Sequence, residues 1–486
     1  MHGISHLQLV PQCSSREILI KEATRAAHRA LCRLVELQVD GCDKFSEYES
    51  TALVVANEIT REILGERLRR IEEEFTDEVV LRGKRYRRHE SGSVAYHSLC
   101  GALEVERYSY RLVGKRNGPT IIPLELRAGI VERATPAFAY AVAQGFAKMP
   151  SRHFEEEMRA MYRQPPSRSS LERLGKYIGG AASQDAVKIE THLRKKERLP
   201  KGAHAISVGI DRTTVPMIEE RSPAQPPSSR RKTRHKPYVR QPPHPFDVVY
   251  RMAYVGTVSI VDANCEALVT RRYAATAEEG PDELISRVMA DVLRAREQNS
   301  ALPIVVVQDG APELWGLMWE AFRRARIEKY EQVIDRFHVN ERLATVLLEI
   351  EKDEALRRQH YDRWQQLLDV KYNGIDLIRR EIALYSHQAK GKAKEVCWAN
   401  WSYISGHERR MRYSLLRRRH LPVASSITEG ACKSLVTTRT KGSGQRWYHD
   451  GLNAVLTLRA IHQSDRFAFF WKRFTRRYEA DIAVAA

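Results

Sequence analysis

The segment Pro303–Leu343 constrains the fold more than any other part of this sequence. It begins with PIVVVQD, in which an apolar, β-branched run that is too short for a helix ends on Asp309. Pro312 follows closely and suits the first turn of a helix. A second strand and helix are predicted in YEQVIDRFHVNERL, with Asp335 and His338 at their junction. Carboxylates at the ends of buried strands are well placed for catalysis or for metal binding.

The strand that ends at Asp309 is the fourth in a series that begins near residue 200. HAISVGIDRTTVPMIEE predicts a first strand that contains Asp211, and FDVVYRMAYVGTVSIVDANCEALVTRRYAAT predicts two antiparallel strands. PDELISRVMADVLRAREQN predicts an amphipathic helix. The resulting order is strand, two antiparallel strands, helix, strand, helix, strand, helix. This order matches a ribonuclease-H-like α/β fold, in which the first and fourth strands are neighbours, so we expect Asp211 and Asp309 to meet.

Changes in sequence pattern divide the chain into further regions. The predicted regions are a helical region at 1–81, a small β-rich subdomain at 82–135, a helical region at 136–199, the first part of the catalytic domain at 200–341, an all-α insertion at 342–423, and a second catalytic part with a basic C-terminal helix at 424–486. Turns are predicted at Ser91-Gly92 and at Cys100-Gly101. The Pro-rich, basic stretch 221–246 cannot bury a core and predicts a long loop.

Within 136–199, the segment SRHFEEEMRAMYRQPPSRSSLERLGKYIGG predicts a helix-turn-helix unit. One helix runs through 154–162, the Pro165-Pro166 pair ends it, and Ser167 or Ser169 caps a second helix. Such a unit reads the major groove of DNA, although two capped helices that only pack together give the same pattern. If the unit binds DNA, the basic residues of its second helix are the expected contacts: Arg168, Arg173 and Lys176.

The charge balance favours a polyanionic partner. Lys and Arg number 80 against 61 Asp and Glu, which gives a net charge of +19. Because such side chains neutralise phosphates, nucleic acid is the expected partner. A membrane is not expected, since no run of about 18 apolar residues exists. The N-terminus lacks a secretory pattern, which favours a cytoplasmic location, and the seven cysteines form no CxxC pair, which is typical of reduced thiols.

A third acid comes from SSITEGACKSLVTTRTKGSGQRWYHDGLNAVLTLRA. Ser426 and Glu429 have the spacing of a capping box, and Glu429 and Lys433 share one helix face. Taken alone, Glu429 is best interpreted as a capping residue, but its place after an all-α insertion and two strand-end aspartates favours a catalytic acid. Two other acids are excluded: Asp262 lies at a hairpin turn, and Glu341 lies one turn into a helix.

Four motifs resemble those of the Mutator-like superfamily of DDE transposases, nearest to the bacterial ISKra-type insertion-sequence transposases. They are GIDRTTVPM around Asp211, VVVQDGAPELW around Asp309, VIDRFHVNERL with the pair Asp335-x-x-His338, and the C-terminal block around Glu429. The resemblance covers about residues 200–475 and extends only loosely to the first 199.

Two features depart from the family pattern. Related N-terminal regions often carry paired cysteines for zinc, whereas this chain has the single Cys100 there, so we expect no structural zinc. The proline- and arginine-rich insert after Glu220 is also unusual, and the sequence assigns it no role.

The resemblance implies that Asp211, Asp309 and Glu429 form a catalytic triad that binds two Mg²⁺ ions, for which Mn²⁺ could substitute. Asp211 would bridge both ions, and the other two acids would each complete one. The chemistry agrees, because in-line cleavage of a phosphodiester needs charge relief that two divalent ions held by carboxylates supply. Water would cut one strand, and the freed 3′-hydroxyl would then attack target DNA.

The implied protein is a DNA transposase that binds the terminal inverted repeats of its element and a target site in double-stranded DNA. We expect a homodimer or larger oligomer in the bacterial cytoplasm, associated with the nucleoid when bound to DNA. Asp335 and His338 are expected to support the acids rather than bind metal. Cations that follow the catalytic helix are the expected phosphate contacts: Lys433, Arg439, Lys441 and Arg446. The alternatives are a nuclease of the same fold and a repurposed transposase that acts as a DNA-binding regulator.

Overall fold

The computed structural model describes residues 44–220 and 246–484, together with Thr24, Arg25, His28, Arg29, Cys32, Val35 and Glu36. Most of the first predicted helix, between residues 14 and 41, and almost all of the predicted loop 221–246 lie outside the described residues. The chain is of mixed α/β class with two five-stranded sheets. It divides into two compact units, one of residues 1–178 with 468–486 and one of residues 179–467.

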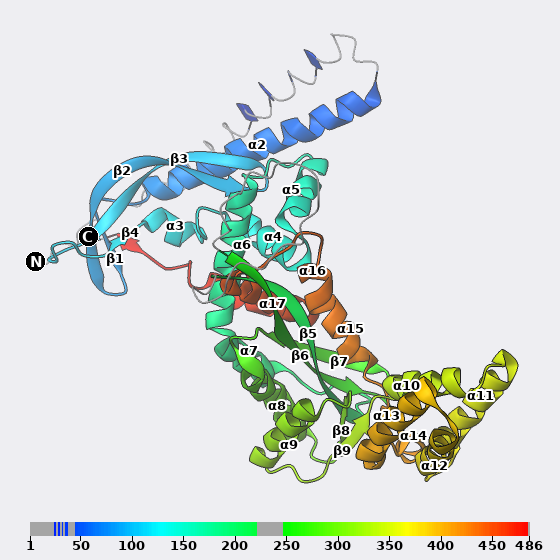
Figure 1. Ribbon diagram of the computed structural model, residues 1–486. Helices are drawn as coiled ribbons and strands as arrows, with labels where there is room; N and C mark the ends of the chain where they lie inside the picture. The colour runs from blue at the N-terminus through cyan, green and yellow to red at the C-terminus, as the bar shows by residue number, and fades with distance from the viewer. Residues whose placement is uncertain are drawn as a thin grey trace, which may run out of the picture. The chain divides into compact units, whose positions relative to one another are not determined.

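The first unit contains an antiparallel sheet in the order β10-β1-β2-β3-β4 (Figure 1). Its elements are α2 (Phe45–Glu73), β1 (Glu78–Leu81), β2 (Lys84–Ser98), β3 (Gly101–Leu112), β4 (Thr120–Ile121), α3 (Pro123–Ala128), α4 (Pro136–Lys148), α5 (Ser151–Ala160), most of α6 (Arg168–Gln184), most of α18 (Phe467–Thr475) and β10 (Ala483–Val484). The predicted small sheet and its turn at Cys100-Gly101 are therefore present. The predicted turn at Ser91-Gly92 is wrong, because Gly92 pairs with Arg107 inside the β2–β3 ladder.

The C-terminal residues complete this first sheet. Val484 pairs with Val79, and Ala483 pairs with Val80, so β10 extends the edge formed by β1. The sequence pattern had grouped these residues with the catalytic region 424–486. The grouping differs because the pairing partner of β10 lies about 400 residues earlier in the chain, where periodicity gives no signal of it.

Helices α4, α5 and α6 pack closely because glycines lie at their contacts. A Cβ atom at Gly145 would lie 2.3 Å from the ring of Phe154, and one at Gly175 would lie 2.5 Å from the ring of Phe146. These distances are far below van der Waals contact, so only glycine permits the approach. The predicted pair of helices separated by the Pro165-Pro166 break is thus part of a packed three-helix cluster.

The second unit is built on a sheet in the order β7-β6-β5-β8-β9 (Figure 1). Its first elements are α7 (Ala186–Lys196), β5 (Ala205–Glu220), β6 (Phe246–Val261), β7 (Ala267–Ala275), α8 (Gly280–Gln298), β8 (Ile304–Gln308), α9 (Pro312–Arg324) and β9 (Glu331–Ile334). From β5 onward, the order of elements is the predicted one. The pair β5–β8 is parallel, so the first and fourth strands are neighbours as expected.

Alternation along β5 and β6 separates the two faces of this sheet. Gly256 of β6 meets Val288 of α8, so α8 covers one face. Gly209 of β5 meets Thr428 on the opposite face, where a Cβ atom at Gly209 would lie 3.0 Å from the Cβ of Thr428. Because side chains two residues apart share a face, Asp211 lies on the same face as Gly209.

An all-α segment follows the sheet and gathers beside β9 (Figure 1). Its helices are α10 (Arg336–Ile350), α11 (Glu354–Val370), α12 (Gly374–Gln388), α13 (Gly391–His407), η1 (Glu408–Arg410) and α14 (Tyr413–Arg418), so the predicted helices of this region are present. The chain then returns to the sheet as α15 (Ser426–Ala431), the π-helix η2 (Cys432–Thr437), α16 (Thr438–Thr440) and α17 (His449–Gln463). Among the described residues, none of the helices has the length and apolarity needed to cross a bilayer.

The contact between Gly209 and Thr428 gives a first prediction. Gly209→Ala should destabilise the protein by about 1–3 kcal/mol, because the added methyl group overfills a closed contact. Gly430→Ala is the matched control, since a Cβ atom there meets nothing within 4 Å. In a helix this exchange should stabilise by about 0.5–1 kcal/mol. Denaturant unfolding gives the free energy of unfolding of both variants. Equal changes in this free energy would refute the close approach of α15 to β5.

Candidate active site

Asp211 and Asp309 lie level on neighbouring parallel strands. In the β5–β8 register, Ser207 pairs with Val305 and Val208 with Val306. Continued by three residues, this register places Asp309 opposite Asp211. In a parallel pair, residues at one level point to the same face of the sheet. The two carboxylates therefore lie near the carboxyl end of β8, close enough for Asp309 to raise the pKa of Asp211.

The surroundings of Asp211 disfavour its charge. Burial raises the pKa of this carboxyl above its ordinary value of 3.8, and the nearby Asp309 raises it further. The backbone N–H of Arg212, which donates to Oδ1 of Asp211 at 2.7 Å, and the thiol of Cys432 act in the opposite direction. A buried carboxylate beside a second carboxylate is the arrangement that a divalent cation relieves.

Two hydrogen bonds of Asp309 and the close packing of Gly310 fix the loop after β8. Oδ1 of Asp309 accepts from the backbone N–H of Ala311 at 2.9 Å, and its carbonyl accepts from Nε1 of Trp315 at 2.7 Å. Gly310 lies against the insertion, because a Cβ atom there would lie 2.4 Å from the ring of Tyr403. The all-α insertion thus touches the residue that follows Asp309.

Glu429 reaches the same face of the sheet on α15. Its neighbour Thr428 lies over Gly209 and shares a hydroxyl–hydroxyl hydrogen bond of 2.7 Å with Thr257 of β6. Cys432, one helical turn after Glu429, lies close enough to Asp211 for the two groups to shift each other's pKa. Burial, followed by the charge of Asp211, raises the pKa of this thiol well above its ordinary value. Glu429 is therefore one helical turn away from a residue that lies near Asp211.

The carboxylate of Glu429 is paired with Lys433. Nζ of Lys433 lies 2.7 Å from Oε1 of Glu429, which confirms that the two residues share a helix face. No group of three or more His, Cys, Asp or Glu side chains close enough to hold a metal ion occurs among the residues that the structure describes. The three predicted acids thus lie on one face of the sheet without forming a ready-made cluster, and Lys433 neutralises the acid that lies farthest from the sheet.

Asp335 is buried, with 1% of its surface exposed, and its side chain is bonded within the fold. Its Oδ1 accepts from the backbone N–H of Phe337 at 2.8 Å, and its Oδ2 accepts from the hydroxyl of Ser425. Nδ1 of His338 lies 3.4 Å from Oδ2, which is an ion-pair distance longer than a well-formed hydrogen bond. Burial raises the pKa of Asp335, but these three partners lower it more, so the net pKa lies below 3.8.

His338 complements this acid. Its pKa is raised above the ordinary value of 6.5, chiefly by Asp335 and against the effect of partial burial, and Asp309 also raises it. The imidazolium is thus favoured next to two aspartates. Its contribution to stability is fully present below pH 6.5 and is lost as the pH rises through the raised pKa. The predicted supporting role of Asp335 and His338 agrees with this geometry.

The start of α15 differs from the sequence prediction. Ser425, and not Ser426, is the N-cap residue, because its carbonyl accepts from the backbone N–H groups of Thr428 and Glu429. The hydroxyl of Ser425 points to Asp335, and Glu429 pairs with Lys433 instead of with the helix start. The predicted capping box at Ser426 is therefore wrong, because the helix begins one residue earlier than predicted and the carboxylate of Glu429 pairs with Lys433.

The four cations predicted after the catalytic helix have different surroundings. Lys433 is exposed and paired with Glu429, whereas Nζ of Lys441 is exposed and donates to the hydroxyl of Thr213 at 2.7 Å. Thr213 lies two residues after Asp211, so Lys441 is beside the acids. Arg446 is exposed. Arg439 is 4% exposed and stacks on the ring of Trp447, so a phosphate would have no access to it, and we leave it out of the contacts proposed below.

The predicted DNA-binding residues of the first unit lie at the surface. Arg168, Arg173 and Lys176 are all exposed on α6, while Leu171 and Leu174 on the same helix are buried. α6 begins directly after Ser167, as predicted, and its charged face is separate from its apolar face. The geometry therefore permits the predicted phosphate contacts.

Comparison of the chain with models of protein families, with curated proteins and with solved structures gives no match.

The opposite surroundings of Asp211 and Asp335 give a second prediction. Without metal at pH 7, Asp211→Asn should raise the melting temperature, because the fold disfavours this charge. Asp335→Asn should lower stability by about 1–3 kcal/mol, because the fold hydrogen-bonds this charge. The contribution of Asp335 is present above its unfolded-state pKa and is lost as the pH falls through its lowered pKa. Calorimetry in EDTA measures the melting temperatures of both variants. If both melting temperatures changed in the same direction, the two assignments would be refuted.

Proposed function

We propose that this chain is a DDE-type DNA transposase whose second unit is a ribonuclease-H-like catalytic domain interrupted by an all-α insertion. The sheet order β7-β6-β5-β8-β9, with only β5–β8 and β8–β9 parallel, supports this fold. The observation that carries the function is the alignment of Asp211 with Asp309 beneath the helix of Glu429. The resemblance of the four motifs supports the same assignment.

The donor set fits two Mg²⁺ ions, because carboxylate oxygens are the ligands that this ion prefers. The pKa of Asp211 is raised because burial and Asp309 disfavour its negative charge, and a bound cation would stabilise that charge. When bound, the ions would supply charge stabilisation at the attacking and leaving oxygens of an in-line displacement. Asp211, Asp309 and Glu429 are the residues that would hold them.

The residues of this chain provide the remaining steps. Glu429 must leave Lys433 to take up its role, which frees the ammonium group of Lys433 to contact a phosphate of the DNA. Lys441 and Arg446 would hold the strand beside β5. Asp335 raises the pKa of His338, so the protonated imidazole would add positive charge near Asp309. Arg168, Arg173 and Lys176 of the first unit would hold the DNA backbone.

Replacing the acids tests the proposed chemistry. With a DNA fragment that carries the gene and its natural flanks, the wild-type chain should cut and join ends in Mg²⁺. Asp211→Ala, Asp309→Ala and Glu429→Ala should each lower the rate by about 10³-fold or more, since several kcal/mol of charge stabilisation is lost. DNA binding in a gel-shift assay should remain. Glu341→Ala is the control, because Glu341 is an exposed acid near the site.

Other outcomes distinguish the alternatives. Cutting without joined products would indicate a nuclease of the same fold. Binding without any cutting by the wild-type chain would indicate a DNA-binding regulator and would contradict the proposed activity. If one of the three variants cut at the normal rate, the role assigned to that residue would be wrong.

The helix-turn-helix assignment has its own test. Arg168→Ala, Arg173→Ala and Lys176→Ala should each weaken DNA binding and reduce the slope of log affinity against log salt by about 1. Arg159→Ala is the control, because Arg159 is exposed but already paired with Glu155 at 2.9 Å. Fluorescence anisotropy at several salt concentrations gives the slopes. Slopes unchanged from wild type would show that α6 only packs within its unit.

A further inference from the structure

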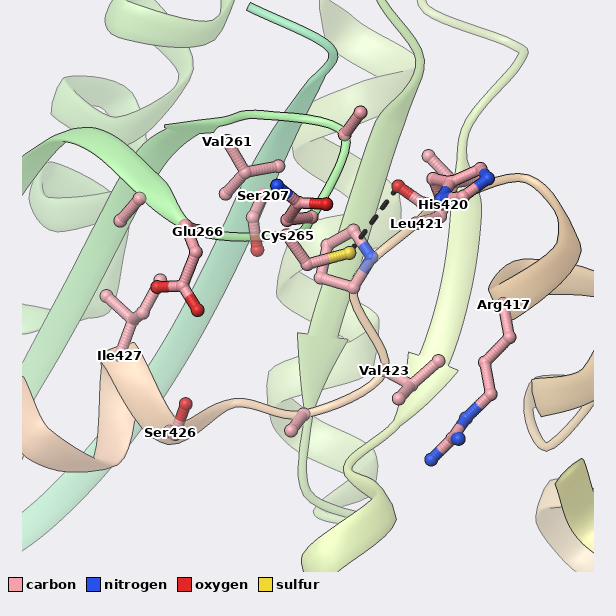
Figure 2. A pocket seen from close by; sticks show the side chains of 15 residues that line it. Ser207, Val261, Cys265, Glu266, Arg417, His420, Leu421, Val423, Ser426 and Ile427 are labelled. Atoms are coloured by element: carbon pink, nitrogen blue, oxygen red, sulfur yellow. Dashed lines mark hydrogen bonds between the residues drawn. The ribbon is translucent and has the colours of Figure 1, made fainter.

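The linker that carries the chain from the insertion to α15 has few supports. It runs from His420 to Ser425 and borders a cavity of about 660 Å³, which is also lined by Ser207 and the hairpin turn around Cys265 (Figure 2). On the cavity side, the thiol of Cys265 donates to the carbonyl of His420 at 3.4 Å. One side of the linker faces this cavity, so its position depends on the packing of Leu421 in the core and on the hydrogen bonds along its other side.

Those bonds converge on the junction between β9 and α10. The backbone N–H of Arg336 donates to the carbonyl of Val423 at 2.9 Å, and the hydroxyl of Ser425 donates to Oδ2 of Asp335. The backbone N–H of Asp335 in turn donates to the carbonyl of Gln308 at 3.0 Å. Gln308 directly precedes Asp309, and Ser425 lies one turn before Glu429. One buried residue is thus bonded to both segments that carry these acids.

We propose that the bond between Asp335 and Ser425 is a latch that sets the position of Glu429 relative to Asp309, so that both are positioning residues for metal binding. This inference rests on the proposed function. Asp335 itself is not placed as a metal ligand, since both of its oxygens are bonded within the fold and its side chain is buried. Without the hydroxyl of Ser425, the bond between Arg336 and Val423 and the backbone bonds of α15 remain, but the first residue of this helix region loses its side-chain link to Asp335.

The latch has a further consequence for the insertion. α10 begins at Asp335 and α14 ends shortly before the linker, so the two ends of the insertion meet at this bond. The hydroxyl of Tyr413 in α14 also donates to the carbonyl of Ile334 at 2.9 Å, which holds the returning chain beside β9. The position of the insertion is therefore coupled to the position of Glu429.

The test compares Ser425→Ala with Ser426→Ala in the full chain. Ser426 is the adjacent residue, is exposed, and lines the cavity, so its hydroxyl is the matched control. Ser425→Ala should weaken the binding of Mn²⁺ by about 10- to 100-fold in calorimetric titration, as is typical when a partner that orients a metal ligand is lost. It should also speed amide hydrogen exchange in residues 426–433 without metal. Ser425→Thr, which keeps the hydroxyl, should restore both.

A double variant tests the shared path. If Asp335 acts on Glu429 through Ser425, Ser425→Ala should add little to the loss of Mn²⁺ affinity caused by Asp335→Asn, whereas additive effects would overturn the latch. Ser425→Ala that behaves like Ser426→Ala in both measurements would also overturn it. If the wild-type chain binds no Mn²⁺, the proposed function fails, and hydrogen exchange alone then decides whether the latch exists.

Discussion

The hydrogen bonds of Asp335 hold together the parts of the second unit that matter most for its proposed activity. The residue is buried, and its backbone and side chain bind the strand before Asp309, the start of α10 and the linker before Glu429. Removing one partner of such a buried carboxylate leaves the others unsatisfied, which is costly. The insertion can therefore interrupt the sheet domain by more than seventy residues and still return the chain to a defined place.

Close packing on one face of the sheet supplies the second constraint. Gly209 lies two residues before Asp211 and Gly310 lies directly after Asp309, and each glycine is approached by a side chain that a Cβ atom would exclude. Thr428 thereby reaches β5, and Tyr403 reaches the loop after β8. The fold keeps Asp211 in surroundings that disfavour its charge and keeps Glu429 paired with Lys433. The charge of Asp211 therefore destabilises the folded protein, and a bound cation would remove this cost. Functional sites often carry charges that lower the stability of the fold.

The sequence predicts the order and type of the elements in the second unit because each strand and helix has a clear period. It also predicts that Asp211 and Asp309 lie near each other, since the order of elements makes the first and fourth strands parallel neighbours. It does not reveal Ser425, Cys432 or Thr428, whose partners lie 90 or more residues away. The glycines beside the two aspartates were the available signal, because an unexplained glycine next to an acid indicates close approach. The Ser426 capping box is wrong because Ser425 is the N-cap residue and Glu429 pairs with Lys433, and the capping-box spacing does not distinguish adjacent serines.

The central claim is that three acids hold two divalent ions against a phosphodiester, and anomalous diffraction tests it most directly. Crystals of the full chain with an end-containing DNA and Mn²⁺ should show two peaks about 4 Å apart. The account predicts that Asp211 contacts both peaks and that Asp309 and Glu429 contact one each, with Lys433 no longer paired to Glu429. Peaks held by other acids, or no ordered Mn²⁺ beside Asp211 when DNA is bound, would contradict it.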